Sequence, residues 1–163
     1  MIKLNLGCGE SKRKGYLNVD SEPQCEPDVC GRIEYMECED GSVDEIIFSH
    51  VLEHLDMATA GAMLRRFYQW LKPDGKLIIS VPNLSLIAKF ISEGCEDDIL
   101  FNWLYGSGLN NNMSHRWGYT DKALKKALTR AGFTRFAYVE PQDIDASFKF
   151  HGEYLSINLA CKK

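Results

Sequence analysis

The sequence has no long hydrophobic run. A helix that crosses a bilayer needs roughly 18 to 20 consecutive apolar residues, and no segment of the 163-residue chain reaches that length. The opening residues, Met1-Ile2-Lys3, lead directly into a strand-like segment, so we expect no secretory leader. We therefore expect a cytoplasmic protein that makes no use of a membrane.

An excess of positive charge is also missing. The chain has 19 basic and 23 acidic residues, which sets its formal net charge at -4. Proteins that hold nucleic acid phosphates carry a positive field, and the nearest basic cluster here, Lys12-Arg13-Lys14, is short. We expect a small-molecule partner and no nucleic acid, while the oligomeric state is not predicted.

The cysteines do not form any C-x-x-C pair. Their spacing matches no common zinc knuckle, and a chain of this length with 45% hydrophobic residues can bury a core without disulfides. We therefore expect reduced thiols and no bound metal. The six positions are Cys8, Cys25, Cys30, Cys38, Cys95 and Cys161.

The patterns that are present indicate one α/β domain over residues 1–163. Segments 2–6 and 16–20 alternate apolar and polar residues, and a third strand is possible near 29–33. Segments 44–49 and 76–81 have the continuous apolar centres of parallel strands buried on both faces. A helical stripe lies between them and stops at the turn 72–75, so the unit should wind right-handed onto a parallel sheet.

The second half of the chain is less regular. Residues 84–119 read as an insertion, with helices near 84–91 and 97–104 and a glycine and asparagine loop at 106–112. We interpret this insertion as a lid or acceptor-binding segment. A helix capped by Thr120 and Gly132 follows. Strands near 136–139 and 154–161 should then pair antiparallel, because the polar loop between them is too short for an ordinary crossover helix.

A glycine turn and an acid carry the first chemical signal. Gly7-Cys8-Gly9 ends the first strand and lets the backbone turn without a Cβ to block a ligand. Asp20 ends the second strand, where a carboxylate can accept hydrogen bonds from a ribose diol. A dinucleotide fingerprint would need a third glycine at the position of Lys12. The pair indicates a nucleotide ligand other than NAD.

Four motifs in order extend this signal over nearly the whole chain. They are Leu4-Asn5-Leu6-Gly7-Cys8-Gly9, Asp20, the segment 44–55 that contains Ser49-His50-Val51-Leu52-Glu53-His54, and Leu71-Lys72-Pro73-Asp74-Gly75 with its following strand to Asn83. Together they resemble the class I S-adenosylmethionine-dependent methyltransferases. The runs Gly15-Tyr16-Leu17-Asn18-Val19-Asp20 and Trp117-Gly118-Tyr119-Thr120 are similar to the small type 11 methyltransferases.

The resemblance implies a fold, a cofactor and a set of binding residues. The fold would be a three-layer, Rossmann-like α/β sheet of seven strands, mostly parallel, with the last strand antiparallel. S-adenosylmethionine would be the methyl donor and S-adenosylhomocysteine the product. The cofactor-binding residues would be Asn5, Leu6, Gly7, Cys8, Gly9, Asp20, Ile33, Ser49, His50 and Glu53.

The chain departs from that family pattern in two places. Only ten residues separate Gly9 from Asp20, so the helix between the first two strands should be shortened or absent. The third strand lacks the usual acid and its following apolar run. Adenine would then contact the backbone around Ile33 and Glu34, or Asp28.

Three residues are candidates for the chemistry of methyl transfer. His50 could remove a proton from an acceptor hydroxyl, or it could shape the cofactor pocket through a hydrogen bond. His115 and Arg116 could face the acceptor, with Arg116 as an anion clamp, or belong to a covering lid. The acceptor itself, an oxygen or nitrogen nucleophile, is not identified.

Two alternatives stay open at this point. His50-Val51-Leu52-Glu53-His54 matches H-x-x-E-H, in which two histidines one helical turn apart bind zinc in a peptidase. The glycine turn with its acid would also suit a nucleotide-binding domain without catalysis.

Overall fold

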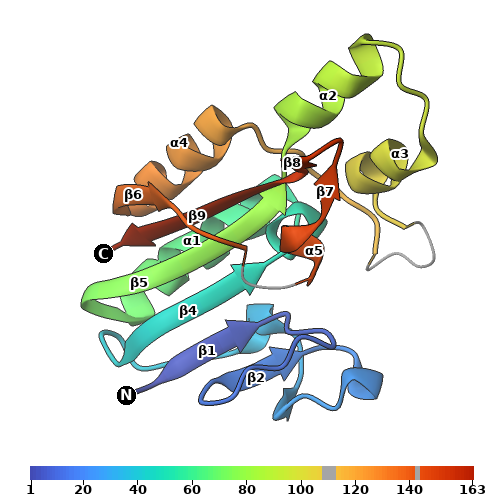
Figure 1. The fold of residues 1–163 in the computed structure, drawn as a ribbon. Coiled ribbons are helices and arrows are strands. Elements are labelled where there is room, and N and C mark those ends of the chain that lie inside the picture. Colours follow the sequence, from blue (N-terminus) through green and yellow to red (C-terminus); the bar gives the residue numbers. More distant parts are fainter. Residues whose placement is uncertain (108–112, 142–143) are drawn as a thin grey trace.

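The computed structural model of the chain describes residues 1–107, 113–141 and 144–163 (Figure 1). Its centre is a seven-stranded sheet with the order β3-β2-β1-β4-β5-β9-β6. The strands are β1 Lys3–Leu6, β2 Leu17–Asp20, β3 Val29–Cys30, β4 Val43–Ser49, β5 Leu71–Pro82, β6 Thr134–Tyr138 and β9 Ser156–Lys162.

The direction of the strands follows the sequence prediction. Strands β1 to β5 run parallel to one another, while β9 lies antiparallel between β5 and β6. The predicted Rossmann-like sheet, mostly parallel with an antiparallel last strand, is therefore confirmed. The predicted third strand near 29–33 is short, because Ile33 already begins the 3₁₀ turn η2 Ile33–Tyr35.

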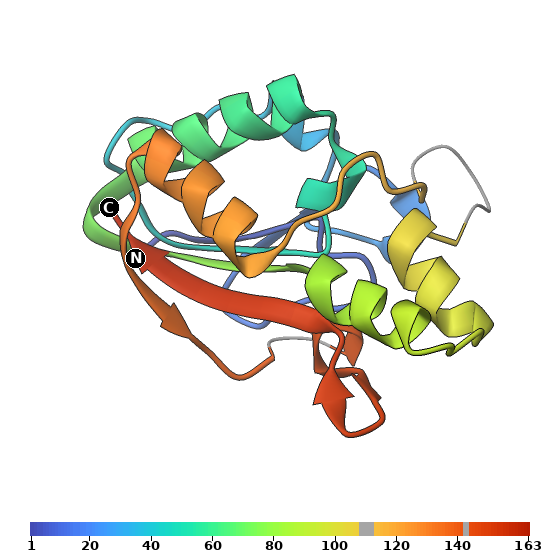
Figure 2. The ribbon, with the colours of Figure 1, turned by 90° about the horizontal axis from the view of Figure 1, so that it is seen from above.

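Two long helices cover one face of the sheet (Figure 2). Helix α1 Met57–Trp70 buries Met63, Phe67 and Trp70 against the sheet, where the Phe67 ring meets Phe48 edge-on with the ring centres 4.9 Å apart. Helix α4 Asp121–Ala131 lies beside α1 and has the predicted caps: Thr120 accepts from the backbone of Ala123, and Gly132 has a φ of 111°.

The opposite face of the sheet is covered by far fewer residues. Its apolar cluster consists of Ile47, Ile78 and Ala160, with Tyr16 and Val139 packed beside it. Residues 7–16 form turns and no helix, as predicted from the short spacing between the first two strands. The one-turn helix α5 Ile144–Ser147 packs on β9 from this side.

The turn predicted at 72–75 lies within β5 and not ahead of the strand. Helix α1 ends at Trp70, and β5 already begins at Leu71, which pairs with Val43. The next pair is Glu45 with Lys76, so residues 72–75 form an irregularity within the strand. The left-handed backbone of Asp74, with a φ of 63°, accommodates the extra residues.

The insertion forms a small unit beside the sheet edge. Helices α2 Leu84–Ser92 and α3 Asp98–Tyr105 pack on each other, close to their predicted positions. Their apolar cluster includes Ile87 and Leu100 and is completed by Phe150 and Leu155 from the end of the chain. The hairpin β7 Lys149–Phe150 with β8 Glu153–Tyr154 was not predicted, and most of the predicted loop 106–112 lies outside the described residues.

No helix in the described part of the chain combines the length and the apolar character needed to cross a membrane.

Candidate functional site

The carboxyl ends of β1, β2 and β4 meet at one edge of the sheet, where ligands of open α/β sheets bind (Figure 1). Gly7 and Gly9 follow β1, with φ angles of 68° and 49°. A Cβ on Gly7 would lie 2.2 Å from a methyl group of Val51, whereas a Cβ on Gly9 would meet nothing within 4 Å. Gly7 therefore packs against the loop after β4, and Gly9 faces open space.

Asp20 fixes the shape of this glycine turn. Its carboxylate accepts from the backbone nitrogen of Gly9 at 2.7 Å and from that of Glu22 at 2.9 Å. Each carboxylate oxygen has a second lone pair, so the same group can also accept from ribose hydroxyls. Between the two glycines, burial first and the charge of Asp20 second raise the pKa of the Cys8 thiol to about 11, so Cys8 is neutral near pH 7.

A pair of buried asparagines replaces the missing helix. The Asn5 side chain donates to the carbonyl of Ser11 at 3.0 Å and to the side-chain oxygen of Asn18 at 2.9 Å. Asn18 also accepts from the backbone of Arg13 and donates twice to Asp28. These hydrogen bonds from Asn18 lower the pKa of Asp28, which leaves that carboxylate engaged in holding the loop.

Two predicted cofactor residues have their side chains in the core. Leu6 is fully buried, and Ile33 is 6% exposed, both in the cluster beneath α1. Only their main chains can therefore face a ligand at the strand ends.

His50 and Glu53 lie together just beyond β4. His50 has a φ of 54°, and its Nδ1 lies 3.1 Å from a carboxylate oxygen of Glu53. Its Nε2 lies 3.0 Å from the hydroxyl of Ser156, at the start of β9, and its ring meets Trp103 edge-on. Burial raises the pKa of the Glu53 carboxyl, but the hydrogen bond from His50 and the charges of His50 and His54 outweigh it, so the pKa is below its usual value.

Two buried polar atoms at this strand end have no partner among the described residues. They are Ser49 Oγ and Glu53 Oε2. Most buried polar atoms in proteins form a hydrogen bond. Because Ser49 ends β4 and Glu53 lies in the turn that follows it, this position is suited to a polar ligand.

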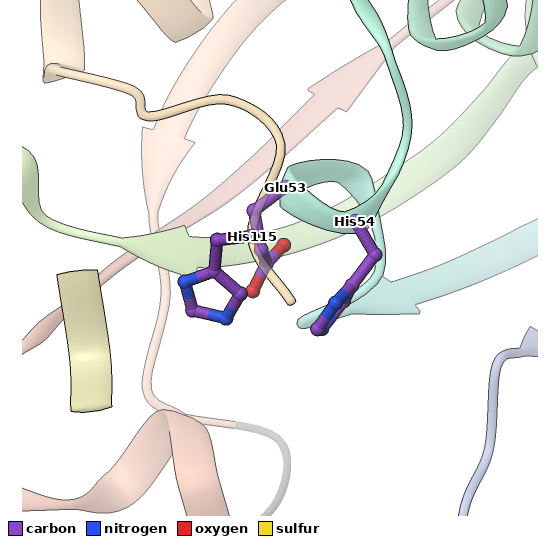
Figure 3. Close-up of side chains that lie close together, drawn as sticks. All are labelled: Glu53, His54 and His115. Atoms are coloured by element: carbon purple, nitrogen blue, oxygen red, sulfur yellow. The ribbon is translucent and has the colours of Figure 1, made fainter. Parts of the chain in front are cut away.

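The last part of the insertion is held against the same strand end. The backbone nitrogens of Arg116 and Trp117 donate to the carbonyl of Glu53 at 2.7 and 3.1 Å. His115 therefore lies beside His54, with the ring centres 4.8 Å apart, and burial is the main cause of its lowered pKa (Figure 3). The Arg116 side chain is exposed, and its charge contributes to the low pKa of Asp56.

His50, Glu53 and His115, which the sequence indicated as site residues, lie close together in the structure. The sequence did not indicate several of the residues that contact them. Ser156 lies 106 residues from His50, and Trp103 lies on α3. No local pattern connects these positions, although Ser156 and Asn158, two polar residues in a largely buried final strand, were a signal that could have been followed.

The local geometry does not fit the zinc peptidase alternative. Residues Leu52–His54 form the short 3₁₀ turn η3, and His50 precedes it with a positive φ. His50 contacts Ser156, whereas Nδ1 of His54 lies 3.2 Å from the carbonyl of Ser114. The two histidines are therefore not placed one α-helical turn apart, as that motif requires.

An apolar hollow of about 230 Å³ lies on the insertion. Its lining consists of Leu84, Ile87, Ala88, Ile91, Ser92 and Leu104. Three of these residues, Leu84, Ile87 and Leu104, also border a smaller space next to His115. The hollow therefore lies next to the space that His115 lines.

Comparison with solved structures supports the fold. A SAM-dependent methyltransferase from Archaeoglobus fulgidus has a TM-score of 0.66 at 17% identity, with 99% of this chain and 85% of that chain covered. The S-adenosylmethionine-dependent methyltransferase from Mesorhizobium loti has a TM-score of 0.64 at 17% identity, with 99% and 90% covered.

A third similar structure contains ligands. It is the 1,6-didemethyltoxoflavin-N1-methyltransferase of Burkholderia thailandensis, with bound 1,6-didemethyltoxoflavin and S-adenosylhomocysteine. Its TM-score is 0.61 at 16% identity, with 99% of this chain and 70% of that chain covered. Another matched chain is longer, and this chain spans only 61% of it.

The sequence comparison decides the family. No curated protein matches the sequence. Residues 11–137, however, match the family model of the methyltransferase domain. Because this match covers most of the chain, the protein belongs to the methyltransferase domain family.

Proposed function

We propose that the protein binds S-adenosylmethionine at the β1, β2 and β4 strand ends and transfers its methyl group to a small molecule. The observation that carries this proposal is the open glycine turn beside Asp20, with the unpartnered Ser49 hydroxyl at the next strand end. The family match and the Burkholderia thailandensis structure, which contains S-adenosylhomocysteine, support the choice of cofactor.

The residues divide by what they can offer a cofactor. The main chain from Leu6 to Gly9 is turned toward the strand edge, and Asp20 can accept hydrogen bonds from the ribose. Ser49 offers a hydroxyl, and the main chain at Ile33 is suited to an adenine ring. Asn5 acts indirectly, because its amide holds the loop that supports the turn.

Methyl transfer requires alignment more than activation. The acceptor attacks the methyl carbon in line with the breaking carbon–sulfur bond, whose electron pair returns to sulfur, so the protein must orient two reactants and exclude water. A proton must also leave when the acceptor is a hydroxyl. His50 is the candidate base, and Glu53 holds its ring in place through Nδ1.

The acceptor would enter beneath the insertion. Helices α2 and α3 carry the apolar hollow, and it borders the space next to His115. An apolar hollow beside polar groups is the usual composition of a small-molecule site. We therefore propose that residues 84–119 form the acceptor lid, with His115 and the exposed Arg116 at its inner and outer margins.

Calorimetry with S-adenosylhomocysteine tests the cofactor proposal. The Asp20→Ala variant should bind about 1 to 3 kcal/mol more weakly, because hydrogen bonds to a charged group are lost. Asp74→Ala is the matched control, since Asp74 is an exposed carboxylate that pairs with Arg135 on β6. Unchanged affinity in Asp20→Ala, or absence of binding at near-millimolar ligand, would contradict the proposal.

A second experiment separates catalysis from binding alone. The protein is incubated with S-adenosylmethionine labelled in its methyl group and with a small-metabolite extract. We expect the label in a small product, accompanied by S-adenosylhomocysteine. Binding without any labelled product across extracts would instead favour a nucleotide-binding domain without catalysis.

A further inference from the structure

Three side chains of kinds that can bind a metal converge beside the proposed cofactor site. Glu53, His54 and His115 each offer one ligand atom, and these atoms all lie within 4.8 Å of one another. Figure 3 shows the Glu53 carboxylate between the two imidazole rings. Nothing in the proposed cofactor contacts requires this arrangement of His54 and His115.

The carboxylate has one oxygen available for a ligand. Glu53 is 1% exposed, and its Oε1 is paired with Nδ1 of His50. Its Oε2 is buried without any hydrogen-bond partner among the described residues. An unpaired carboxylate oxygen in the interior is costly, and metal coordination is one of the few ways to satisfy it.

The His54 imidazole is already oriented by the backbone, and the His115 ring packs against it. Nδ1 of His54 lies 3.2 Å from the carbonyl of Ser114 and can donate its hydrogen there. The His115 ring is half-buried and meets the His54 ring edge-on, with the ring centres 4.8 Å apart. Histidines that bind metals commonly donate their second ring N–H to a backbone carbonyl, which fixes the ring and leaves the other nitrogen as the ligand.

Main-chain hydrogen bonds also hold together the two segments that contain Glu53, His54 and His115. Backbone bonds from Arg116 and Trp117 to the Glu53 carbonyl join η3 to the segment that contains His115. The cluster therefore brings together residues 61 positions apart through main-chain contacts that do not depend on the ligand side chains.

We propose that Glu53, His54 and His115 form a site for one divalent transition-metal ion. Two imidazoles and one carboxylate are the donor set of many catalytic zinc and iron sites, in which further positions stay open. Around a zinc ion the ligand atoms lie about 3.4 Å apart, given bonds of about 2.0 to 2.1 Å. The observed spread of 4.8 Å is wider, so side-chain rotations would have to bring the three ligand atoms closer when the ion binds. The sequence alone predicted no metal.

The site narrows the class of acceptor, and this step rests on the proposed function. A hydroxyl that binds the ion through oxygen has a lowered pKa, so its proton passes to solvent or to His50. The oxygen then forms the new bond to the methyl carbon while the carbon–sulfur electron pair returns to sulfur. With the apolar hollow nearby, the acceptor class is an apolar molecule that carries a hydroxyl.

Metal titration of the full chain tests the site. Chelator-treated protein is titrated with Zn²⁺ and with Mn²⁺ by calorimetry, and we expect about one ion per chain. His54→Ala and His115→Ala should each lower the affinity at least about 100-fold, because even residues behind the ligands cost 10- to 100-fold. His151→Ala is the control, since His151 lies on the β7–β8 hairpin among aromatic rings.

A spectroscopic measurement on the unaltered protein covers the case in which a variant does not fold. Co²⁺ bound by nitrogen and oxygen shows visible ligand-field bands without the strong near-ultraviolet band of a cobalt–thiolate bond. We expect visible ligand-field bands without the cobalt–thiolate band. A thiolate band would assign the ion to the free cysteines and overturn the proposal, as would binding unaffected in both histidine variants.

Two probe ligands separate this inference from the proposed function. S-adenosylhomocysteine should bind with or without metal, whereas acetohydroxamate, an oxygen chelator, should bind only the metal-loaded protein. Binding of S-adenosylhomocysteine without any metal uptake would overturn the metal site alone. Metal uptake without S-adenosylhomocysteine binding would overturn the proposed cofactor and leave the metal site standing.

Discussion

The two glycines of the turn after β1 lack a side chain for different reasons. Gly7 and Gly9 share a left-handed backbone, but only Gly7 is crowded, by the side chain of Val51. One glycine is therefore needed for packing between two loops, and the other for access of a ligand. The sequence predicted both glycines at the site without separating these roles.

Alanine at each glycine should separate them. Gly7→Ala should destabilise the fold by about 2 to 5 kcal/mol, as a left-handed alanine costs about 1 to 2 kcal/mol and overpacking a further 1 to 3. Gly9→Ala should destabilise the fold only by the cost of a left-handed alanine, about 1 to 2 kcal/mol. It should, however, weaken S-adenosylhomocysteine binding. Denaturant unfolding and calorimetry measure the two effects. Adding Val51→Ala to Gly7→Ala should recover part of the stability, and no recovery would contradict the assigned contact.

At the scale of elements, local patterns predicted well where one segment decides its own structure. Helix α4 is such a case, because its caps at Thr120 and Gly132 lie within the segment. Thr120→Ala should cost about 1 kcal/mol, since the backbone of Ala123 loses its acceptor. Thermal unfolding with Thr129→Ala as control measures this, and an equal effect of both changes would mean that the cap does not contribute.

Elements that depend on distant partners were predicted less well. The β7–β8 hairpin has two residues in each strand, too short for a periodic pattern, and Phe150 packs against helix α2. The irregular start of β5 depends on pairing with Val43, and proline and glycine at 73 and 75 indicated a turn. The candidate site divides similarly: the sequence showed the glycines and Asp20, but not the contact of His50 with Ser156.

At the scale of the molecule, helices cover one face of the sheet much more than the other, and on the sparsely covered face polar side chains connect the strands. Glu45, on the sparsely covered face, is hydrogen-bonded by Tyr16 and paired with Lys3 and Lys76. These contacts join the loop before β2 to β1, β4 and β5. Where a helix is absent, a polar network therefore connects adjacent strands across the open face.

This network should make stability depend on acidity. Burial raises the pKa of the Glu45 carboxyl, but hydrogen bonds from Tyr16 and Lys76 and the charges of Lys76 and Lys3 outweigh it and hold the pKa below its usual value. A carboxylate whose pKa is lower in the folded state stabilises the fold above the unfolded pKa. That contribution is lost as the pH falls through the folded pKa. Burial and Glu45 raise the pKa of Tyr16 to about 12, so the phenol stays a donor throughout this range.

Tyr16→Phe should reveal the contribution of the network in urea unfolding measured from pH 7 to pH 3. At pH 7 we expect a loss of about 1 kcal/mol, the net value of one hydrogen bond. The loss should shrink as the pH falls, because protonation of Glu45 removes the charge that the phenol stabilises in the unaltered protein. Tyr35→Phe, at a side chain 79% exposed, is the control and should show no such trend. A loss that is constant with pH would show that Tyr16 stabilises the fold by packing and that the open face does not depend on the charge of Glu45.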